Sequence, residues 1–285
     1  MRDLYLGIET GGTKVVAGVA RLVAGEPSLV APEVVVPTRH PEQTLDAVFT
    51  AVAGMAPLDE IGAMGVASFG PVDLKEARML ATPKPGWSGF HLAEALTARL
   101  AVPVGFDTDV NAAALAEHRW GAARGADVAV YITVGTGIGG GLVVKGAPVH
   151  GLLHPEMGHV FVPRRPGDDF EGACEVHGPC LEGMAAGPSI RRRWGASGES
   201  LPDDHPAWEM AAWYLGVGMA QLTLALSPQV IVMGGGVMQR DLHEAVGRNL
   251  QETIGGYVPV PPVVPPHAER PGLLGAFALA EAARP

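Results

Sequence analysis

The chain has 285 residues, of which 47% are hydrophobic and only 18% charged, so it can bury a substantial core and is not expected to be disordered. Its formal net charge of -10 argues against a general nucleic-acid-binding protein, which normally presents a basic face. We recognise no leader sequence and no apolar run that could cross a membrane, and the two cysteines do not indicate secretion, so we expect a cytoplasmic protein.

The first part of the chain alternates β-rich runs with segments of helical periodicity. Strands are predicted at 3–9, 14–23, 29–38, 61–70 and 102–109, and helices at 41–56, 91–101 and 110–123, with a loop over 71–89. A TGGT turn separates the first two strands.

The pattern then restarts. Strands are predicted at 128–134, 140–149 and 229–237, helices at 206–226, 241–254 and 273–283, and a Pro- and Gly-rich segment with clustered His and Cys fills 150–188. The order strand, glycine turn, strand therefore occurs twice, at 3–23 and at 128–145. This repeat predicts two related α/β domains with a ligand-binding cleft between them.

The stretch VGTGIGGG, residues 134–141, contains the G-x-G-x-x-G pattern that often marks dinucleotide binding. That fold needs a helix directly after the glycines, so that pyrophosphate rests on the helix N-terminus. Here the glycines lead into GLVVKG, which is β-branched and apolar. We therefore reject the Rossmann interpretation in favour of a hairpin, whose glycines taken alone would more often be structural.

The pairing of two such turns favours a phosphate site instead. ETGGTK at 9–14 and GTGIGGG at 135–141 each lie between two predicted strands, and opposed glycine turns can hold a triphosphate through backbone N–H groups. Thr13, Lys14 and Thr136 add hydroxyl and ammonium donors. A third cluster, Gly234–Gly236, ends another strand and could admit an adenine ring close to the backbone.

Two acids, Asp107 and Asp109, end a predicted strand just before a helix. A carboxylate there could accept a proton from an attacking hydroxyl, as phosphoryl transfer requires. Asp109 could equally be an N-cap of the helix, a part that Asn111 could also play. Spacing alone leaves these alternatives open.

Four residues offer metal-binding atoms: His159, and Cys174, His177 and Cys180 in the order C-x-x-H-x-x-C. Such a set suits a closed tetrahedral zinc site that would order a loop poor in core residues. The alternatives are two buried thiols beside surface histidines, or a Cys174–Cys180 disulfide, and His154 could replace His159. We favour the metal.

The motifs ETGGTK, DTDVNAAALAEHRWG, VGTGIGGGLVVKG, HGLLHPEMGHVFV, CEVHGPCLEG and IVMGGGV occur in this order over nearly the whole chain. Together they resemble the ROK sugar kinases, which have the actin-like ATPase fold. The resemblance implies two α/β domains of the actin-like, ribonuclease H-like type. One would comprise residues 1–112 and the terminal helix at 272–285, and the other residues 113–271, including a zinc loop at 154–182.

The resemblance also implies roles for individual residues. Asp109 would be the catalytic base, and ATP would be bound by Glu9, Gly11, Gly12, Thr13, Lys14, Gly135, Thr136, Gly137, Gly139, Gly234, Gly235 and Gly236. Glu9 stands where many actin-like kinases have Asp, and it would serve a Mg²⁺-bound water. Asn111, Glu156, His159 and Glu182 would contact the sugar. His159, Cys174, His177 and Cys180 would hold structural zinc; the family pattern E-x-G-H selects His159.

The C-x-x-H-x-x-C spacing with TPK and DTD is most similar to the bacterial fructokinase branch, which implies phosphorylation of fructose at the 6-hydroxyl. Thr108 departs from the Asn of family glucokinases, and glucose, mannose or an N-acetylhexosamine are alternative substrates. A sugar-responsive regulator without catalysis is the alternative of a different class. The expected partners are ATP and a hexose, without nucleic acid or membrane, and the resemblance suggests a homodimer.

Two residues and two segments give less specific signals. Trp87 could line a sugar pocket or simply pack, and Lys84 could touch sugar or phosphate. The run Arg191–Arg193 is expected on a solvated helix face, and the Pro-rich segment 259–271 is expected to be a rigid connector.

Overall fold

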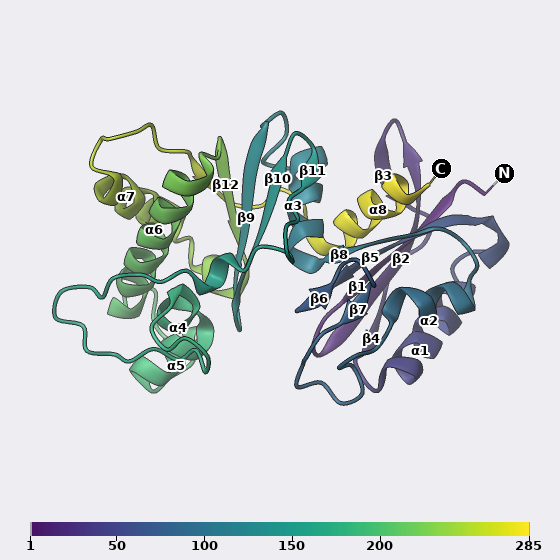
Figure 1. Ribbon diagram of the computed structural model, residues 1–285, viewed down its shortest axis with the longest axis horizontal. Helices are drawn as coiled ribbons and strands as arrows, with labels where there is room; N and C mark the ends of the chain where they lie inside the picture. The colour runs from purple at the N-terminus through teal and green to yellow at the C-terminus, as the bar shows by residue number, and fades with distance from the viewer. Residues whose placement is uncertain (1, 285) are drawn as a thin grey trace. The chain divides into compact units, whose positions relative to one another are not determined.

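The computed structural model describes residues 2–284 (Figure 1). Its contacts divide the chain into two compact units. The first contains the chain up to Ala116, His150–His154 and the segment from Ala268; the second contains Glu117–Val149 and Pro155–His267. The division expected from the sequence places these boundaries at nearby positions, after residue 112 and after residue 271. The outer limits of that expected division, residues 1 and 285, lie outside the described residues.

The sheet of the first unit has the strand order β3-β2-β1-β5-β8, with β4 also paired to β2. Its strands are β1 (Leu4–Thr10), β2 (Lys14–Val23), β3 (Glu26–Leu29), β4 (Val34–Pro37), β5 (Ile61–Ser68) and β8 (Val104–Thr108). β1 and β2 form an antiparallel hairpin, and β5 and β8 continue the sheet in parallel. The single strand expected over 29–38 is wrong: it is two strands, and Pro32, which has no N–H for a sheet, lies between them.

Helices cover both faces of this sheet. On one face, α1 (Pro41–Ala53) and α2 (Leu92–Arg99) pack on a core that includes Leu6, while Tyr5 contributes to the opposite core beneath α8 (Pro271–Ala283). α8, yellow in Figure 1, contacts β1, β5 and β8. It approaches so closely that a Cβ at Gly65 would overlap the backbone of Ala276. The expected loop at 71–89 contains a small hairpin of β6 (Val72–Asp73) and β7 (Arg78–Met79).

The sheet of the second unit has the order β11-β10-β9-β12-β13. Its strands are β9 (Val128–Val134), β10 (Ile138–Val144), β11 (Ala147–Pro148), β12 (Val230–Gly234) and β13 (Val263–Val264). β9 and β10 are antiparallel, whereas β12 runs parallel to β9. The arrangement β10-β9-β12 thus repeats β2-β1-β5, which confirms the repeat seen in the sequence. β13 lies within the Pro-rich segment and pairs with β12, so that segment is more than a connector.

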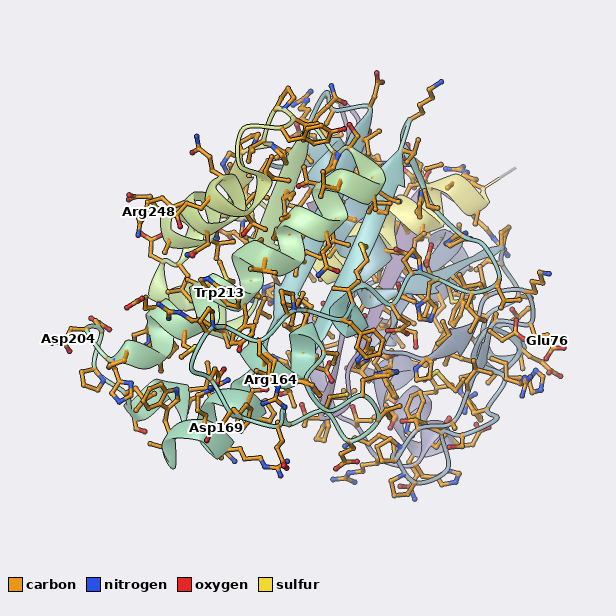
Figure 2. The ribbon with its side chains drawn as sticks, turned by 60° about the vertical axis from the view of Figure 1, so that its left-hand side comes forward. Glu76, Arg164, Asp169, Asp204, Trp213 and Arg248 are labelled. Atoms are coloured by element: carbon orange, nitrogen blue, oxygen red, sulfur yellow. The ribbon has the colours of Figure 1, made fainter. Side chains whose placement is uncertain are left out.

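The helices of the second unit are α4 (Leu181–Ala185), α5 (Gly187–Trp194), α6 (Pro206–Leu226) and α7 (His243–Ile254). α6 packs against α7 and against α4. The solvated face expected for the arginine run is wrong for Arg193, whose side chain is 11% exposed and pairs with the buried Asp168 at 2.5 Å. Charged residues such as Glu76, Asp204 and Arg248 do project from the surface (Figure 2).

α3 (Asp109–Trp120) begins in the first unit and ends in the second. Among residues 2–284, the structure contains no helix with both the length and the apolar character that a bilayer span requires.

Candidate functional site

The first glycine turn, Gly11–Lys14, joins β1 to β2. Gly11 N–H donates to the carbonyl of Lys14 at 2.9 Å, which closes the turn. Thr38, which directly follows β4, holds the turn in place: its hydroxyl donates to Gly11 O at 2.6 Å and its N–H donates to Thr13 O at 2.9 Å. Thr13 and Lys14 are exposed, so their polar groups can reach a ligand.

Glu9 lies at the end of β1, where its carboxylate meets the start of α8. It lies against Gly272 and accepts a hydrogen bond from the backbone N–H of Leu273. Burial raises the pKa of the Glu9 carboxyl, and the charges of Lys14 and Arg270 oppose that rise. Glu9 therefore combines a partly buried carboxylate with two nearby cations beside the first glycine turn.

Asp109 is the first residue of α3, and its Oδ1 accepts from the N–H of Val110 at 2.9 Å. The N-cap is the preceding residue: Thr108 Oγ1 accepts from the N–H of Asn111 at 3.1 Å. The capping role that the sequence left open for Asp109 or Asn111 thus belongs to Thr108. Asp109 is only partly buried, so its carboxylate is not committed to the core.

Asp107 and Asn111 form a buried support beneath this helix end. Asp107 Oδ1 accepts from the Thr108 N–H and from Asn111 Nδ2, both at 2.8 Å, and its Oδ2 lies 2.8 Å from His150 Nε2. Asn111 is fully buried, and within residues 2–284 its Oδ1 has no hydrogen-bond partner. Asn111 therefore supports Asp107 directly, and sequence reasoning missed His150 altogether.

The second glycine turn, Gly135–Gly137, joins β9 to β10, and Gly135 N–H donates to Gly137 O at 2.9 Å. Gly139 follows within β10. Gly235 lies directly against the backbone of Val134, and Gly234 pairs with Thr133 across β12 and β9. The structure thus brings the cluster Gly234–Gly236 to the same end of the sheet as the second turn, while the side chain of Thr136 is exposed.

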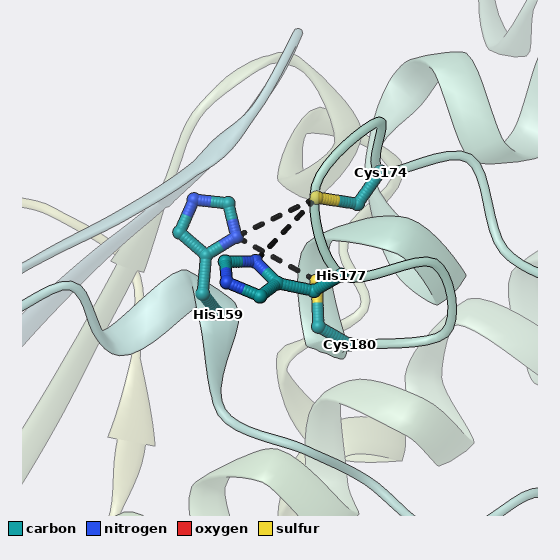
Figure 3. A group of neighbouring side chains, drawn as sticks. All are labelled: His159, Cys174, His177 and Cys180. Carbon is teal, nitrogen blue, oxygen red and sulfur yellow. Dashed lines mark hydrogen bonds between the residues drawn. The ribbon is translucent and has the colours of Figure 1, made fainter.

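The four predicted metal ligands come together in the second unit (Figure 3). One ligand atom from each of His159, Cys174, His177 and Cys180 lies within 4.8 Å of the others. Cys174 Sγ is 3.7 Å from His159 Nδ1 and 3.8 Å from His177 Nδ1, and Cys180 Sγ is 3.6 Å from His159 Nδ1. Both cysteines are free thiols, so the disulfide alternative does not apply in this structure.

Cys180 is also the N-cap of α4, where its Sγ accepts from the N–H of Gly183 at 3.4 Å. Burial raises the pKa of the Cys180 thiol to about 11. A bound cation would offset this shift, because coordination deprotonates a thiol. The alternative ligand His154 lies elsewhere, in the first unit, where its Nε2 accepts from the Val72 N–H at 3.5 Å.

The two glutamates expected at the sugar flank this cluster. Glu156 is exposed, and its carbonyl accepts from the His159 N–H at 3.0 Å. Glu182 is partly buried, and its Oε2 accepts from the N–H of Ile138 at 3.0 Å. Glu182 is therefore hydrogen-bonded to the residue that directly follows the second glycine turn, a contact that spacing could not reveal.

The two residues whose roles the sequence left open have different surroundings. Trp87 is fully buried, stacks edge-on between Phe69 and Phe90, and donates from Nε1 to Arg39 O at 2.8 Å, so it packs the first unit's core. Lys84 instead lies beside the first glycine turn, with its Cε 3.3 Å from the position that a Cβ on Gly12 would take. Its ammonium group is a further cation for that turn.

The predicted site residues thus fall into one set in each unit. The first set comprises Glu9, Gly11–Lys14, Asp109 and Asn111; the second comprises the second glycine turn, Gly234–Gly236, the metal ligands, Glu156 and Glu182. Each set combines a hairpin glycine turn with acidic side chains, and the second adds the metal ligands.

Comparison with known proteins gives consistent matches over almost the whole chain. A fructokinase of Zymomonas mobilis is 41% identical, and the alignment covers 99% of this chain and 98% of the relative. Among solved structures, the ROK hexokinase of Thermus thermophilus has a TM-score of 0.81 at 31% identity, with 98% of each chain covered. The ROK glucokinase of Streptomyces griseus, solved with glucose and AMPPNP, has a TM-score of 0.78 at 28% identity, covering 98% of this chain and 99% of that one. The ROK family model matches residues 5–283, and the chain belongs to the ROK family.

Proposed function

We propose that this protein is an ATP-dependent sugar kinase that phosphorylates a hexose at its 6-hydroxyl, with fructose as the preferred substrate. The observation that carries the proposal is the repeated hairpin: β1–β2 and β9–β10 each present a glycine turn at the same position of a related sheet. Backbone N–H groups of such turns bind phosphate oxygens. Membership of the ROK family and the fructokinase similarity support the same activity.

Asp109 is the proposed catalytic base. It would accept the proton of the sugar hydroxyl as that oxygen attacks the γ-phosphate. Its place at the first residue of α3, on a helix end capped by Thr108 and supported by Asp107, supports this role because a fixed carboxylate can be aligned with the acceptor.

ATP would bind through the glycines 11, 12, 135, 137, 139 and 234–236, with Thr13, Lys14 and Thr136 as additional donors. Magnesium bound with ATP neutralises charge that builds up on the phosphates during transfer. Glu9 is the carboxylate beside the first turn that would hold a water of that ion, and the neighbouring Lys14 would contact phosphate. On the sugar, Glu156, His159 and Glu182 are the proposed contacts, and Asn111 would act through Asp107.

We propose that the metal held by the cysteine and histidine cluster is structural zinc. In a tetrahedral site with a Zn–N distance of ~2.1 Å and a Zn–S distance of ~2.3 Å, nitrogen and sulfur ligands lie about 3.6 Å apart. The observed Sγ to Nδ1 distances of 3.6 to 3.8 Å fit this edge length. Two thiolates and two imidazoles also form a closed donor set, which is typical of structural rather than catalytic zinc.

Glucose is the second candidate substrate, because a family member with bound glucose shares the fold over 98% of this chain. A cytoplasmic location and a homodimer remain predictions, as does the absence of nucleic-acid and membrane partners, which the net charge of -10 supports for nucleic acid.

A coupled assay of ATP consumption tests the proposal with fructose, glucose, mannose and N-acetylhexosamines, and NMR of the product gives the phosphorylated position. We expect the highest kcat/KM for fructose and a 6-phosphate product. If fructose ranks last, the substrate assignment is wrong; if no sugar stimulates ATP consumption, the kinase proposal is wrong.

A further inference from the structure

Ile138, the first residue of β10, follows directly on the second glycine turn and is held from one side by Glu182. The Ile138 N–H donates to Glu182 Oε2 at 3.0 Å. The same oxygen would be 2.7 Å from a Cβ placed on Gly137, so the carboxylate lies close over the end of the turn. Glu182 belongs to α4, whose N-cap is the metal ligand Cys180.

The carbonyl side of Ile138 is covered by a second segment. A Cβ on Gly158 would overlap the Ile138 carbonyl, so only glycine permits this approach. Gly158 lies in the single helical turn Met157–His159, and the metal ligand His159 is its neighbour in the chain. Both peptide groups of Ile138 are thus contacted by segments that lead within one or two residues to a metal ligand.

A third contact holds the start of the turn. Gly187 N–H, at the beginning of α5, donates to Gly135 O at 2.8 Å. Ser189 in the same helix donates from Oγ to the Glu182 carbonyl at 2.8 Å, which fixes α4 relative to α5. The segment after Cys180 therefore touches the second turn at both ends, through Gly135 and Ile138.

We propose that the metal cluster and Glu182 together position the second glycine turn for nucleotide binding, in addition to any contact that Glu182 makes with sugar. This inference rests on the proposed function, in which that turn binds ATP phosphates. A turn of small residues has few side-chain contacts of its own and loses much conformational entropy when it is ordered. Two segments fixed at one metal site, Met157–His159 and α4, would order the turn before the nucleotide binds. This removes part of the entropic cost from nucleotide binding. Glu182 is then a positioning residue for the nucleotide.

The first test measures the Kd of AMPPNP by calorimetry in the absence of sugar. Glu182→Ala should weaken binding about tenfold, because the turn loses a charge-assisted hydrogen bond. Glu182→Gln keeps an acceptor for the Ile138 N–H and should bind within about threefold of wild type. Glu175→Ala, which removes an exposed carboxylate from the loop between the ligands Cys174 and His177, should leave the Kd unchanged.

The outcomes distinguish a failure of this inference from a failure of the proposed function. If the wild-type protein does not bind AMPPNP, the proposed function fails. If wild type binds and Glu182→Ala binds equally well, the function stands and the positioning role of Glu182 is wrong. If Glu175→Ala weakens nucleotide binding as strongly as Glu182→Ala, the effect is not specific to the contact with Ile138, and the inference is again wrong.

The contribution of the metal cluster is tested separately, by hydrogen–deuterium exchange and by the Kd of AMPPNP in the absence of sugar. Chelator-treated protein and Cys174→Ser should show faster exchange of the peptide containing Ile138 and weaker AMPPNP binding, with the β1–β2 hairpin unchanged as an internal check on folding. Gly158→Ala should have the same effect by displacing its segment from the Ile138 carbonyl. Gly247→Ala in α7, where a Cβ would have no atom within 4 Å, is the matched control. Unchanged exchange at Ile138 after verified metal loss would overturn the coupling.

Discussion

His150 Nε2 lies 2.8 Å from Oδ2 of Asp107, the buried carboxylate two residues before Asp109. His150 begins the segment His150–His154, which packs with the first unit although the chain on either side of it belongs to the second. The contact therefore joins a distant loop to the network that fixes the start of α3.

We predict that His150→Ala lowers kcat about tenfold, corresponding to about 1.4 kcal/mol, with a smaller change in the KM for ATP. Asp107 loses a partner on Oδ2, and the helix start that carries Asp109 becomes less well aligned. Steady-state kinetics measure the split between kcat and KM. His150→Gln places an amide donor near the position of Nε2 and should recover most of the activity; equal losses in both variants would contradict a hydrogen-bonding role.

Asp109→Asn is expected to lower kcat by about 10²- to 10⁴-fold, because the variant cannot accept the sugar proton. Asparagine has nearly the same shape, so the Kd for AMPPNP and the melting temperature should stay close to wild type. Single-turnover measurement of sugar phosphate formation gives the chemical step directly. The exposed Asp59 provides the control Asp59→Asn, which should be fully active. Full activity of Asp109→Asn would remove the base assignment.

Metal analysis of the purified protein is expected to give one zinc per chain. Removing it with a strong chelator should lower Tm by at least about 5 °C and weaken sugar affinity, since the loop that carries Glu156 and Glu182 loses its common anchor. Differential scanning calorimetry and sugar titrations measure the two effects, and added zinc should reverse both. Fully active protein without bound metal would exclude this role.

The local signals in the sequence predicted most of the framework. Glycine turns between β-branched runs identified both hairpins, because turn conformation and strand propensity are properties of adjacent residues. The spacing C-x-x-H-x-x-C likewise placed three ligands in one loop, and the structure brings His159, the fourth ligand predicted from the sequence, to them. The ROK resemblance rests on these same short motifs.

The features that the sequence did not predict depend mainly on contacts between residues far apart in the chain. His150 and Asp107 are 43 positions apart, and no local pattern links them. Arg193 is buried because Asp168, on another segment, neutralises it, although its own neighbours suggested an exposed basic run. α4 and α5 lie partly in a Gly- and Pro-rich segment that predicts loop; the N-cap of α4 is a cysteine, which is not a usual capping residue.

Glu9 allows a prediction about pH. Burial raises the pKa of its carboxyl above the usual 4.5, so the folded protein holds this proton more tightly than the unfolded chain does. The stability that the group contributes is therefore fully present below pH 4.5 and is lost as pH rises through the higher folded-state pKa. Glu9→Gln keeps an acceptor for the Leu273 N–H but carries no charge. The Tm of this variant minus that of wild type should be smallest near pH 4 and should increase toward pH 8. Melting curves across that range measure the difference, with the control variant Glu60→Gln, at an exposed position, expected to follow wild type throughout.

Glu9→Gln should also lose kinase activity at neutral pH, because a neutral amide cannot attract a magnesium-bound water as a carboxylate does. A constant Tm difference would contradict the shifted ionisation, whereas retained activity would contradict the role of Glu9 at the metal-bound water.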